Sequence, residues 1–113
     1  MGTIYRRAAA LPWVPHPEAE GLEMKELLAL PGEGATSRVH RIPLAGIPEH
    51  AHPRRHLIWV LSGRGRLWVQ DVGELVLEPG VFVYVPSDLP HRFHSVEEGL
   101  ELLTVSLASE RTR

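Results

Sequence analysis

Five of the seven histidines in this chain lie in two groups. His50, His52 and His56 form the first group, and His91 and His94 form the second. Residues two or four positions apart point to the same side of an extended strand, so the side chains of the first group converge if their segment is extended. A neutral imidazole is the commonest metal ligand, and a ligand from a distant strand would complete a site. The grouping favours a metal centre, although a histidine taken alone is more often solvated or bonded locally.

The chain contains no cysteine, which limits the chemistry of such a centre. Thiolate zinc sites, iron–sulfur clusters, disulfide bonds and a cysteine nucleophile are all excluded. A metal would have to be bound by histidine, aspartate, glutamate or backbone oxygen. Imidazole ligands suit a divalent transition metal, and Fe(II), Ni(II), Cu(II), Zn(II) and Mn(II) all remain open.

Short alternating segments would have to position these histidines. From residue 22 to residue 107, segments of four to nine residues alternate apolar and polar side chains and are separated by glycine and proline. This pattern is typical of an all-β sandwich or small barrel of antiparallel strands. The predicted strands are Leu22–Leu30, Ala35–Leu44, Arg55–Ser62, Arg66–Gln70, Glu74–Leu77, Val81–Val85, His91–His94 and Leu100–Leu107.

Glycine and proline mark the reversals between these strands. Turns are expected at Gly63, Gly73 and Gly80, because glycine supplies the positive φ that tight turns demand. Pro86 and Pro90 cannot donate to a strand ladder, so we expect them to frame a loop that leads into His91.

Strand alternation also places two further side chains. His94 follows His91 by three residues, so it should lie on the opposite face as a surface or interface histidine. Trp59 alternates with His56 and is expected on the outside of the sheet or at an interface, where it would serve packing.

Length and charge limit the partners of this domain. A chain of 113 residues forms one domain with one core, and its formal net charge of -2 creates no positive field for nucleic acid or anionic lipid. No apolar run approaches the length of a membrane span, and the stretch Ala8–Val14 is too short and too interrupted by proline for a secretory signal. We therefore expect a cytoplasmic protein that binds neither nucleic acid nor membranes.

The first residues differ from the rest of the chain. Closely spaced prolines between Pro12 and Pro17 favour an extended arm over a helix. We predict an N-terminal arm over 1–21, a barrel over 22–108 and a C-terminal tail over 109–113. The arm carries Trp13 and Val14, which would pack on the barrel or reach a partner subunit. Both alternating faces of Arg55–Ser62 are apolar, so both should be covered, either by a second subunit or by the N-terminal arm. We expect a homodimer.

The two histidine groups lie in patterns that resemble the cupin superfamily, whose first motif is G-x5-H-x-H-x3,4-E-x6-G and whose second is G-x5-P-x-G-x2-H-x3-N. In the first motif, His50 and His52 are followed by His56 at the glutamate position and then by Gly63. The second motif is matched by Gly80, Pro86, Asp88, His91 and Ser95. The resemblance covers roughly residues 22 to 107 and implies a single cupin barrel, a double-stranded β-helix or jelly roll.

Three positions depart from the family pattern. Leu44 stands where the first motif opens with glycine, and Gly46 is the nearest glycine. His56 replaces the usual glutamate, so the resemblance implies a set of imidazole ligands from His50, His52, His91 and, unless it swings away, His56. Asp88 replaces a turn glycine and should tolerate left-handed backbone geometry.

The resemblance implies a metal-dependent enzyme that acts on a small molecule. Without a carboxylate ligand, the metal would keep its full charge and favour an anionic, oxygen-rich substrate such as an enolate, carboxylate or diketonate. Four histidines on an octahedral metal would leave two positions, so dioxygenase-like chemistry and isomerase-like or cyclase-like Lewis-acid chemistry both remain open.

The resemblance does not identify a catalytic base or the residues that contact the substrate. Because the glutamate is absent, a catalytic base would have to be another residue, with Tyr84 and His94 as candidates. Arg54 and Arg55 could steer an anionic substrate. The main alternative is a non-catalytic cupin that senses a metal or a small molecule, and a storage cupin without metal is disfavoured by the histidines.

Overall fold

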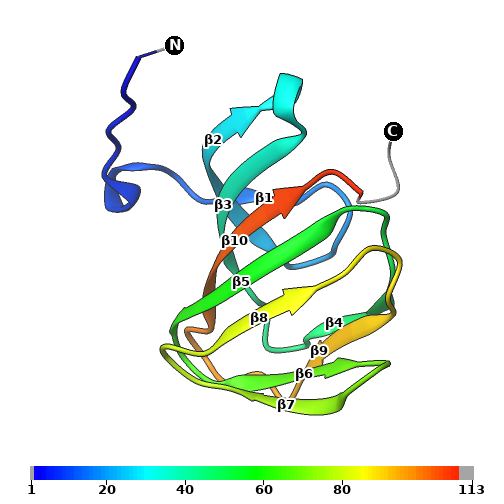
Figure 1. The fold of residues 1–113 in the computed structure, drawn as a ribbon. Helices are drawn as coiled ribbons and strands as arrows, with labels where there is room; N and C mark the ends of the chain where they lie inside the picture. Colours follow the sequence, from blue (N-terminus) through cyan, green and yellow to red (C-terminus); the bar gives the residue numbers. More distant parts are fainter. Residues whose placement is uncertain (1, 110–113) are drawn as a thin grey trace.

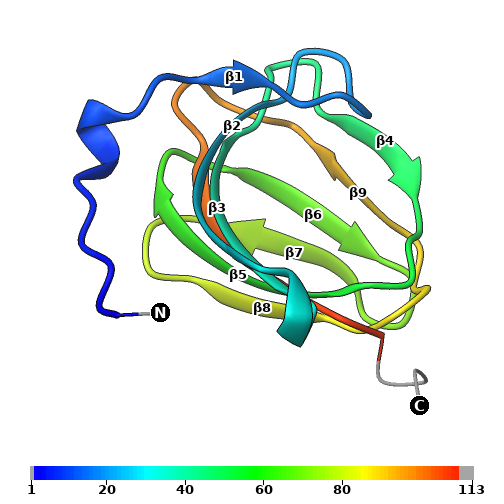
Figure 2. The same ribbon diagram turned by 90° about the horizontal axis from the view of Figure 1, so that it is seen from above.

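The computed structural model describes residues 2–109 and consists of two antiparallel sheets that curve around a common interior (Figures 1 and 2). This architecture confirms the predicted all-β jelly roll. The larger sheet has the order β1 (Val14–Pro15), β2 (Glu23–Leu30), β3 (Ala35–Arg41), β10 (Glu101–Leu107), β5 (Arg55–Ser62) and β8 (Phe82–Val85). The smaller sheet has the order β4 (Ile47–His50), β9 (His91–His94), β6 (Gly65–Val69) and β7 (Gly73–Leu77). Two short 3₁₀ helices, η1 (Ala8–Ala10) and η2 (Pro31–Glu33), complete the described elements.

Each of the eight predicted segments contains a strand, but two strands were missed. One is β1, a two-residue strand within the predicted arm. The other is β4, which holds Pro48 and lies at the edge of its sheet, with a shift in register between Ile47 and His50. Proline cannot donate to a ladder and is tolerated at such an edge, so β4 lacks the alternation of an ordinary strand.

The side chains that face the interior change from apolar to polar along the strands. On β10, Leu102 and Thr104 face inward and are both buried, and Thr104 pairs with Ile58 of β5. On β5, the inward series runs from Ile58 to His56, and on β9 it runs from Phe93 to His91. One end of the barrel is therefore filled with apolar side chains, while the other end carries histidines.

The apolar end forms the hydrophobic core. The most completely buried large side chains are Leu67, Leu77, Leu100 and Leu102, together with Val85, which pairs with His56 and borders the histidine end. These residues come from both sheets and from the turn before β10, so the core joins the two layers.

Two turn positions bring the strands close together. Gly63 has a φ of 78°, and a Cβ atom there would overlap the backbone of Leu100, so the predicted turn requires glycine. Asp88 has a φ of 60°, which confirms the predicted left-handed geometry at this position.

The N-terminal segment joins the larger sheet through β1 and then runs away from the barrel (Figures 1 and 2). Trp13 lies between Lys25 and Arg41, with Nζ 4.5 Å and Cζ 4.1 Å from the ring centroid. Cation–π contacts of this kind attach the arm to β2 and β3. The predicted domain bounds stay a prediction, and the predicted tail falls mostly outside residues 2–109.

Among residues 2–109, no helix has the length and apolar character that a membrane crossing requires. The cytoplasmic location stays a prediction.

Candidate metal centre

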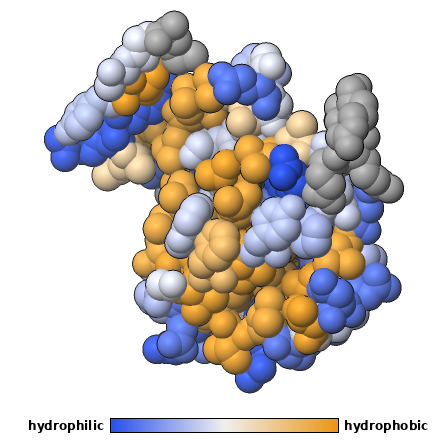
Figure 3. Space-filling model, viewed as in Figure 1, coloured by the Kyte–Doolittle hydropathy of each residue, from blue (hydrophilic) through white to orange (hydrophobic). Residues whose placement is uncertain are grey.

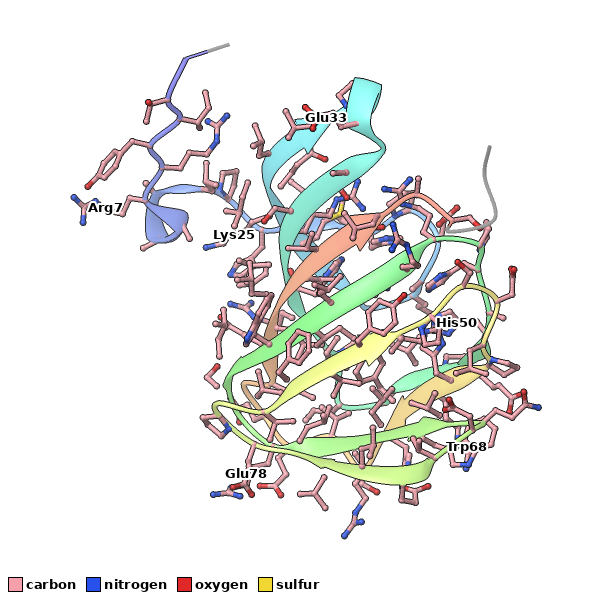
Figure 4. The ribbon with its side chains drawn as sticks, viewed as in Figure 1. Arg7, Lys25, Glu33, His50, Trp68 and Glu78 are labelled. Carbon is pink, nitrogen blue, oxygen red and sulfur yellow. The ribbon has the colours of Figure 1, made fainter. Side chains whose placement is uncertain are left out.

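Three histidines meet at the polar end of the barrel. His50 of β4 and His91 of β9 are cross-strand partners, and their ring centroids are 4.3 Å apart. His52 lies 5.4 Å from His50 and 5.1 Å from His91 by the same measure. Each of the three residues offers one ring nitrogen as a ligand, and these three atoms all lie within 4.8 Å of one another. The group could therefore hold a metal ion. Figure 4 shows His50 between β4 and β8 at this end of the barrel.

The side chains of His50 and His52 converge as the spacing predicted, but not because they lie on one extended strand. The chain leaves the strand after His50, and β5 begins only at Arg55, so the segment is not continuously extended. The backbone N–H of Asp88 donates a hydrogen bond of 2.7 Å to the carbonyl of His52. The loop between β8 and β9, which delivers His91, therefore also fixes His52.

The orientation of the three rings is set by backbone carbonyls. Nδ1 of His50 lies 2.8 Å from the carbonyl of Pro48, Nδ1 of His91 lies 2.8 Å from that of Leu89, and Nδ1 of His52 lies 3.2 Å from that of Arg54. A carbonyl can only accept, so each neutral ring donates from Nδ1 and keeps the lone pair on Nε2. Ligating histidines are held by carbonyls in this way, so the donor set fits a divalent transition metal.

The surroundings of His52 and His91 favour their neutral forms. Burial lowers the pKa of His91 to about 4, against a hydrogen bond to Leu89 that raises it. Burial also lowers the pKa of His52, and the charge of Glu18, on the loop between β1 and β2, slightly opposes this shift. Neutral imidazoles need lose no proton to bind a metal near neutral pH.

His56 lies beside this group. It comes from β5, where it pairs with Val85, and its ring centroid is 4.2 Å from that of His52. Burial lowers its pKa to about 3, with further contributions from His52 and His91. His56 is not one of the three residues whose ligand atoms lie within 4.8 Å of one another, so its role as a fourth ligand stays a prediction.

Both arginines beside the cluster bind the protein itself. Arg54 donates to the hydroxyl of Ser106 at 2.6 Å, to the carbonyl of Gly34 at 2.7 Å and to the carbonyl of Ser106 at 3.1 Å. Arg55 donates to the carbonyl of Ala108 at 2.8 Å. The bonds to Ser106 and Ala108 tie the start of β5 to the end of β10. A role of either arginine in steering substrate stays a prediction.

The two candidate bases lie on outer faces. Tyr84 pairs with Leu57 and alternates with the buried Val85, which places it outside the larger sheet. His94 alternates with the buried Phe93, as predicted, and its Nε2 lies 2.7 Å from a carboxylate oxygen of Glu74. A catalytic role for either stays a prediction.

Sequence reasoning missed a set of polar residues on the inner wall of β2 and β3. Nδ1 of His40 lies 3.1 Å from the hydroxyl of Thr104, and burial lowers the pKa of His40 to about 4. Arg38 and Glu26 form an ion pair of 3.3 Å beside it. The available signal was the alternation of Thr36, Arg38 and His40 within a predicted strand, where one face of the strand was polar.

Comparison with known proteins identifies a family and several solved structures with a similar fold. The family model described as "Cupin domain" matches residues 31–106. A search of curated proteins found no match. Among solved structures, a predicted oxalate decarboxylase from Thermotoga maritima is 18% identical, with a TM-score of 0.77 over 93% of this chain and 99% of the other.

Two further solved structures have a similar fold. An RmlC-like cupin from Shewanella frigidimarina is 17% identical, with a TM-score of 0.75 over 97% of this chain and 95% of the other. The polyketide cyclase RemF from Streptomyces resistomycificus is 21% identical, with a TM-score of 0.71 over 95% of this chain and 79% of the other. These likenesses describe the fold alone, because proteins with this fold differ in chemistry.

Proposed function

The chain belongs to the cupin family, and from this premise we propose that it is a metal-dependent enzyme acting on a small, anionic or oxygen-rich molecule. The observation that carries the proposal is the group of His50, His52 and His91, in which three rings converge and each is held through Nδ1 by a backbone carbonyl. Carbonyl contacts of this kind orient the histidines that ligate metals in proteins.

The protein's own residues would have three tasks in this reaction. His50, His52 and His91 hold the metal, and His56 is the candidate fourth ligand. The metal would supply Lewis acidity toward a substrate oxygen or, if it is redox-active, dioxygen chemistry. The apolar residues beneath the histidines exclude water from that side, and polar groups on β2, β3 and β10 line the interior beside them.

Neutral ligands favour an anionic substrate. Three or four imidazoles contribute no negative charge, so a divalent metal held by them keeps its charge. An enolate, a carboxylate or a diketonate would compensate this charge. The reaction types that fit are dioxygenation and the isomerisation or cyclisation of such a molecule.

The test is metal content together with turnover. Protein purified without a His tag is analysed by plasma emission, and oxygen uptake is followed with diketones, flavonols and dihydroxybenzoates. We expect about one transition metal per chain in the wild type and in the control variant His94→Ala, but not in His52→Ala. Iron, nickel or copper with oxygen uptake supports a dioxygenase, and product formation without uptake supports an isomerase or cyclase. Metal binding without turnover of any compound would overturn the enzyme and leave a sensor.

We further propose that a second copy of this chain covers the outer face of the larger sheet. Eight apolar side chains lie there, with Arg55 at one end beside Leu107, and Figure 3 shows the apolar surface over β5, β8 and β10. The rings of Trp59 and Phe82 are in tilted contact, with centroids 4.7 Å apart, although the two residues are 38% and 46% exposed. An apolar patch of this kind can pack against its own copy across a two-fold axis. The eight residues are Leu57, Trp59, Leu61, Phe82, Tyr84, Leu103, Val105 and Leu107.

Sedimentation equilibrium tests this dimer. We expect the wild type to be dimeric, Trp59→Glu to be monomeric, and Val76→Glu, on the outer face of the other sheet, to stay dimeric. A monomeric wild type, or a dimeric Trp59→Glu, would contradict the proposal.

A further inference from the structure

An arginine on the inner wall of the barrel has an incomplete set of hydrogen bonds. Arg38 of β3 pairs across the sheet with Thr104 of β10, and Thr104 in turn pairs with the core residue Ile58. Cross-strand partners share a face, so Arg38 lies on the inward side of the larger sheet. Its guanidinium donates one hydrogen bond, from Nη2 to Glu26 at 3.3 Å.

The Nε atom of Arg38 is buried and has no acceptor. Among residues 2–109, it is the one buried side-chain nitrogen or oxygen that lacks a hydrogen-bond partner. A buried donor left unpaired is unfavourable, so such an atom in a native protein calls for an explanation. In an arginine, Nε and Nη2 together form a fork that can bind a carboxylate through two parallel hydrogen bonds. Glu26 accepts only from Nη2, so the Nε side of the fork is unfilled.

A line of inward-facing residues connects this arginine to the metal centre. His40 lies two residues from Arg38 on the same face of β3 and is bonded to Thr104. The charge of Arg38 acts on His40, and His40 acts in turn on His56, which lies beside His52. By register, His56 is level with Ser106, Arg38 with Thr104 and His40 with Leu102, so Arg38 lies one inward-facing position from the level of His56 and shares the interior with the histidine group.

We propose that Arg38 binds a carboxylate of the substrate, and that this substrate carries a second oxygen group, which reaches the histidine centre. Glu26 holds the guanidinium in place in the free protein and yields the fork to the incoming carboxylate. This inference rests on the proposed function, because it assigns the second contact point of the same substrate. The ligand class is thus a small molecule with two anionic or oxygen-rich ends, such as a dicarboxylate or a keto acid.

Binding of straight-chain dicarboxylates tests the assignment. Zinc-loaded protein is titrated by calorimetry with malonate, succinate, glutarate and adipate, and with acetate as the compound that has one end. We expect one length in the series to bind the wild type at least tenfold more tightly than acetate does. Arg38→Gln should weaken that compound about 10- to 100-fold and leave acetate unchanged, because charged bidentate bonds are lost. The affinity of Arg38→Lys for the dicarboxylate should lie between those of the wild type and Arg38→Gln, because lysine keeps the charge but cannot form two parallel bonds.

Two further variants keep the test independent of folding. Glu26→Gln should bind the dicarboxylate a few-fold more tightly, since it removes the competing carboxylate. Arg64→Gln is the matched control, because Arg64 forms an ion pair of the same length, 3.3 Å, with Glu78 on the surface. It should leave the affinity unchanged.

The possible failures are distinguishable. If the wild type does not bind zinc, the proposed function fails. If zinc binds but Arg38→Gln holds the dicarboxylate as tightly as the wild type does, only the assignment of Arg38 is overturned. The same holds if zinc binds and no dicarboxylate exceeds acetate.

Discussion

The two ends of the barrel interior are built on the same strands but from different residues. At one end, Leu67 and Leu77 are sealed from solvent, whereas at the other His50 and His52 are only half-buried and hold hydrogen bonds that direct their free nitrogens toward one another. Burial of apolar side chains supplies most of the stability of a small domain. The apolar core and the candidate metal-binding histidines therefore lie at different ends, so stability and metal binding should respond to different substitutions.

The largest effect is expected at the apolar end. Leu67→Ala removes a fully buried side chain and leaves a cavity, which should lower the free energy of unfolding by about 3–5 kcal/mol. Urea denaturation of the metal-free protein measures this change, with Leu44→Ala, at a 65% exposed position, as the control. The stoichiometry of metal in the folded fraction should stay at one per chain, and a loss of metal without unfolding would break the comparison.

The next effect is expected at the histidine end. His52→Ala should weaken metal binding by about 100-fold or more, because it removes one of three converging ligands. The free energy of unfolding without metal should change by less than about 1 kcal/mol, since this ring is only partly buried. Competition with a chromophoric chelator gives the affinity. A variant that bound metal like the wild type would remove His52 from the centre.

Acid should destabilise the metal-free protein through the polar end. In the folded state the pKa values of His40 and His91 are about 4, below the 6.5 of an unfolded histidine. The unfolded chain therefore binds more protons between these values, so stability is full above pH 6.5 and falls as the pH drops toward 4. We expect a loss of about 1–2 kcal/mol per histidine, smaller than the pKa shifts alone would give because the sites are partly solvated.

The variant His40→Asn sharpens this prediction. Asparagine can keep a hydrogen bond to Thr104 but does not titrate, so the slope of stability against pH between 6.5 and 4 should become shallower. An unchanged slope in urea denaturation would show that His40 does not contribute to acid sensitivity.

The smallest effect is expected on the outer surface. Glu74→Ala breaks the contact with His94 on the outside of the smaller sheet, where both side chains are partly exposed. An exposed pair of this kind contributes less than about 0.5–1 kcal/mol. Metal affinity should be unchanged, and a clear drop in it would mean that the two faces of β9 are coupled.

The sequence was enough to predict most of the strands and the grouping of His50, His52 and His91, because both rest on local patterns. Alternation identified the strand that carries His56, and turn glycines such as Gly63 marked where the chain reverses. The edge strand β4 was missed, since Pro48 and a shift in register hide its alternation. The local sequence pattern cannot identify a strand that is defined mainly by its pairing with a distant strand.

The inner wall could not be predicted for a similar reason. Arg38 and His40 lie on β3, and only the pairing of β3 with β10 shows that they face the interior beside Thr104. The hydrogen bond between Asp88 and His52 likewise joins two loops that are far apart in the sequence. Contacts of this kind depend on the closed barrel, so a motif search cannot reveal them.

The most direct test of the central claim is a crystal of metal-loaded protein measured at the absorption edge of the bound metal. We expect one anomalous peak per chain, about 2.0–2.3 Å from the Nε2 atoms of His50, His52 and His91. The distance from that peak to His56 decides whether it is a fourth ligand. A peak elsewhere, such as between His94 and Glu74, or no peak in crystals grown with excess metal, would contradict the account.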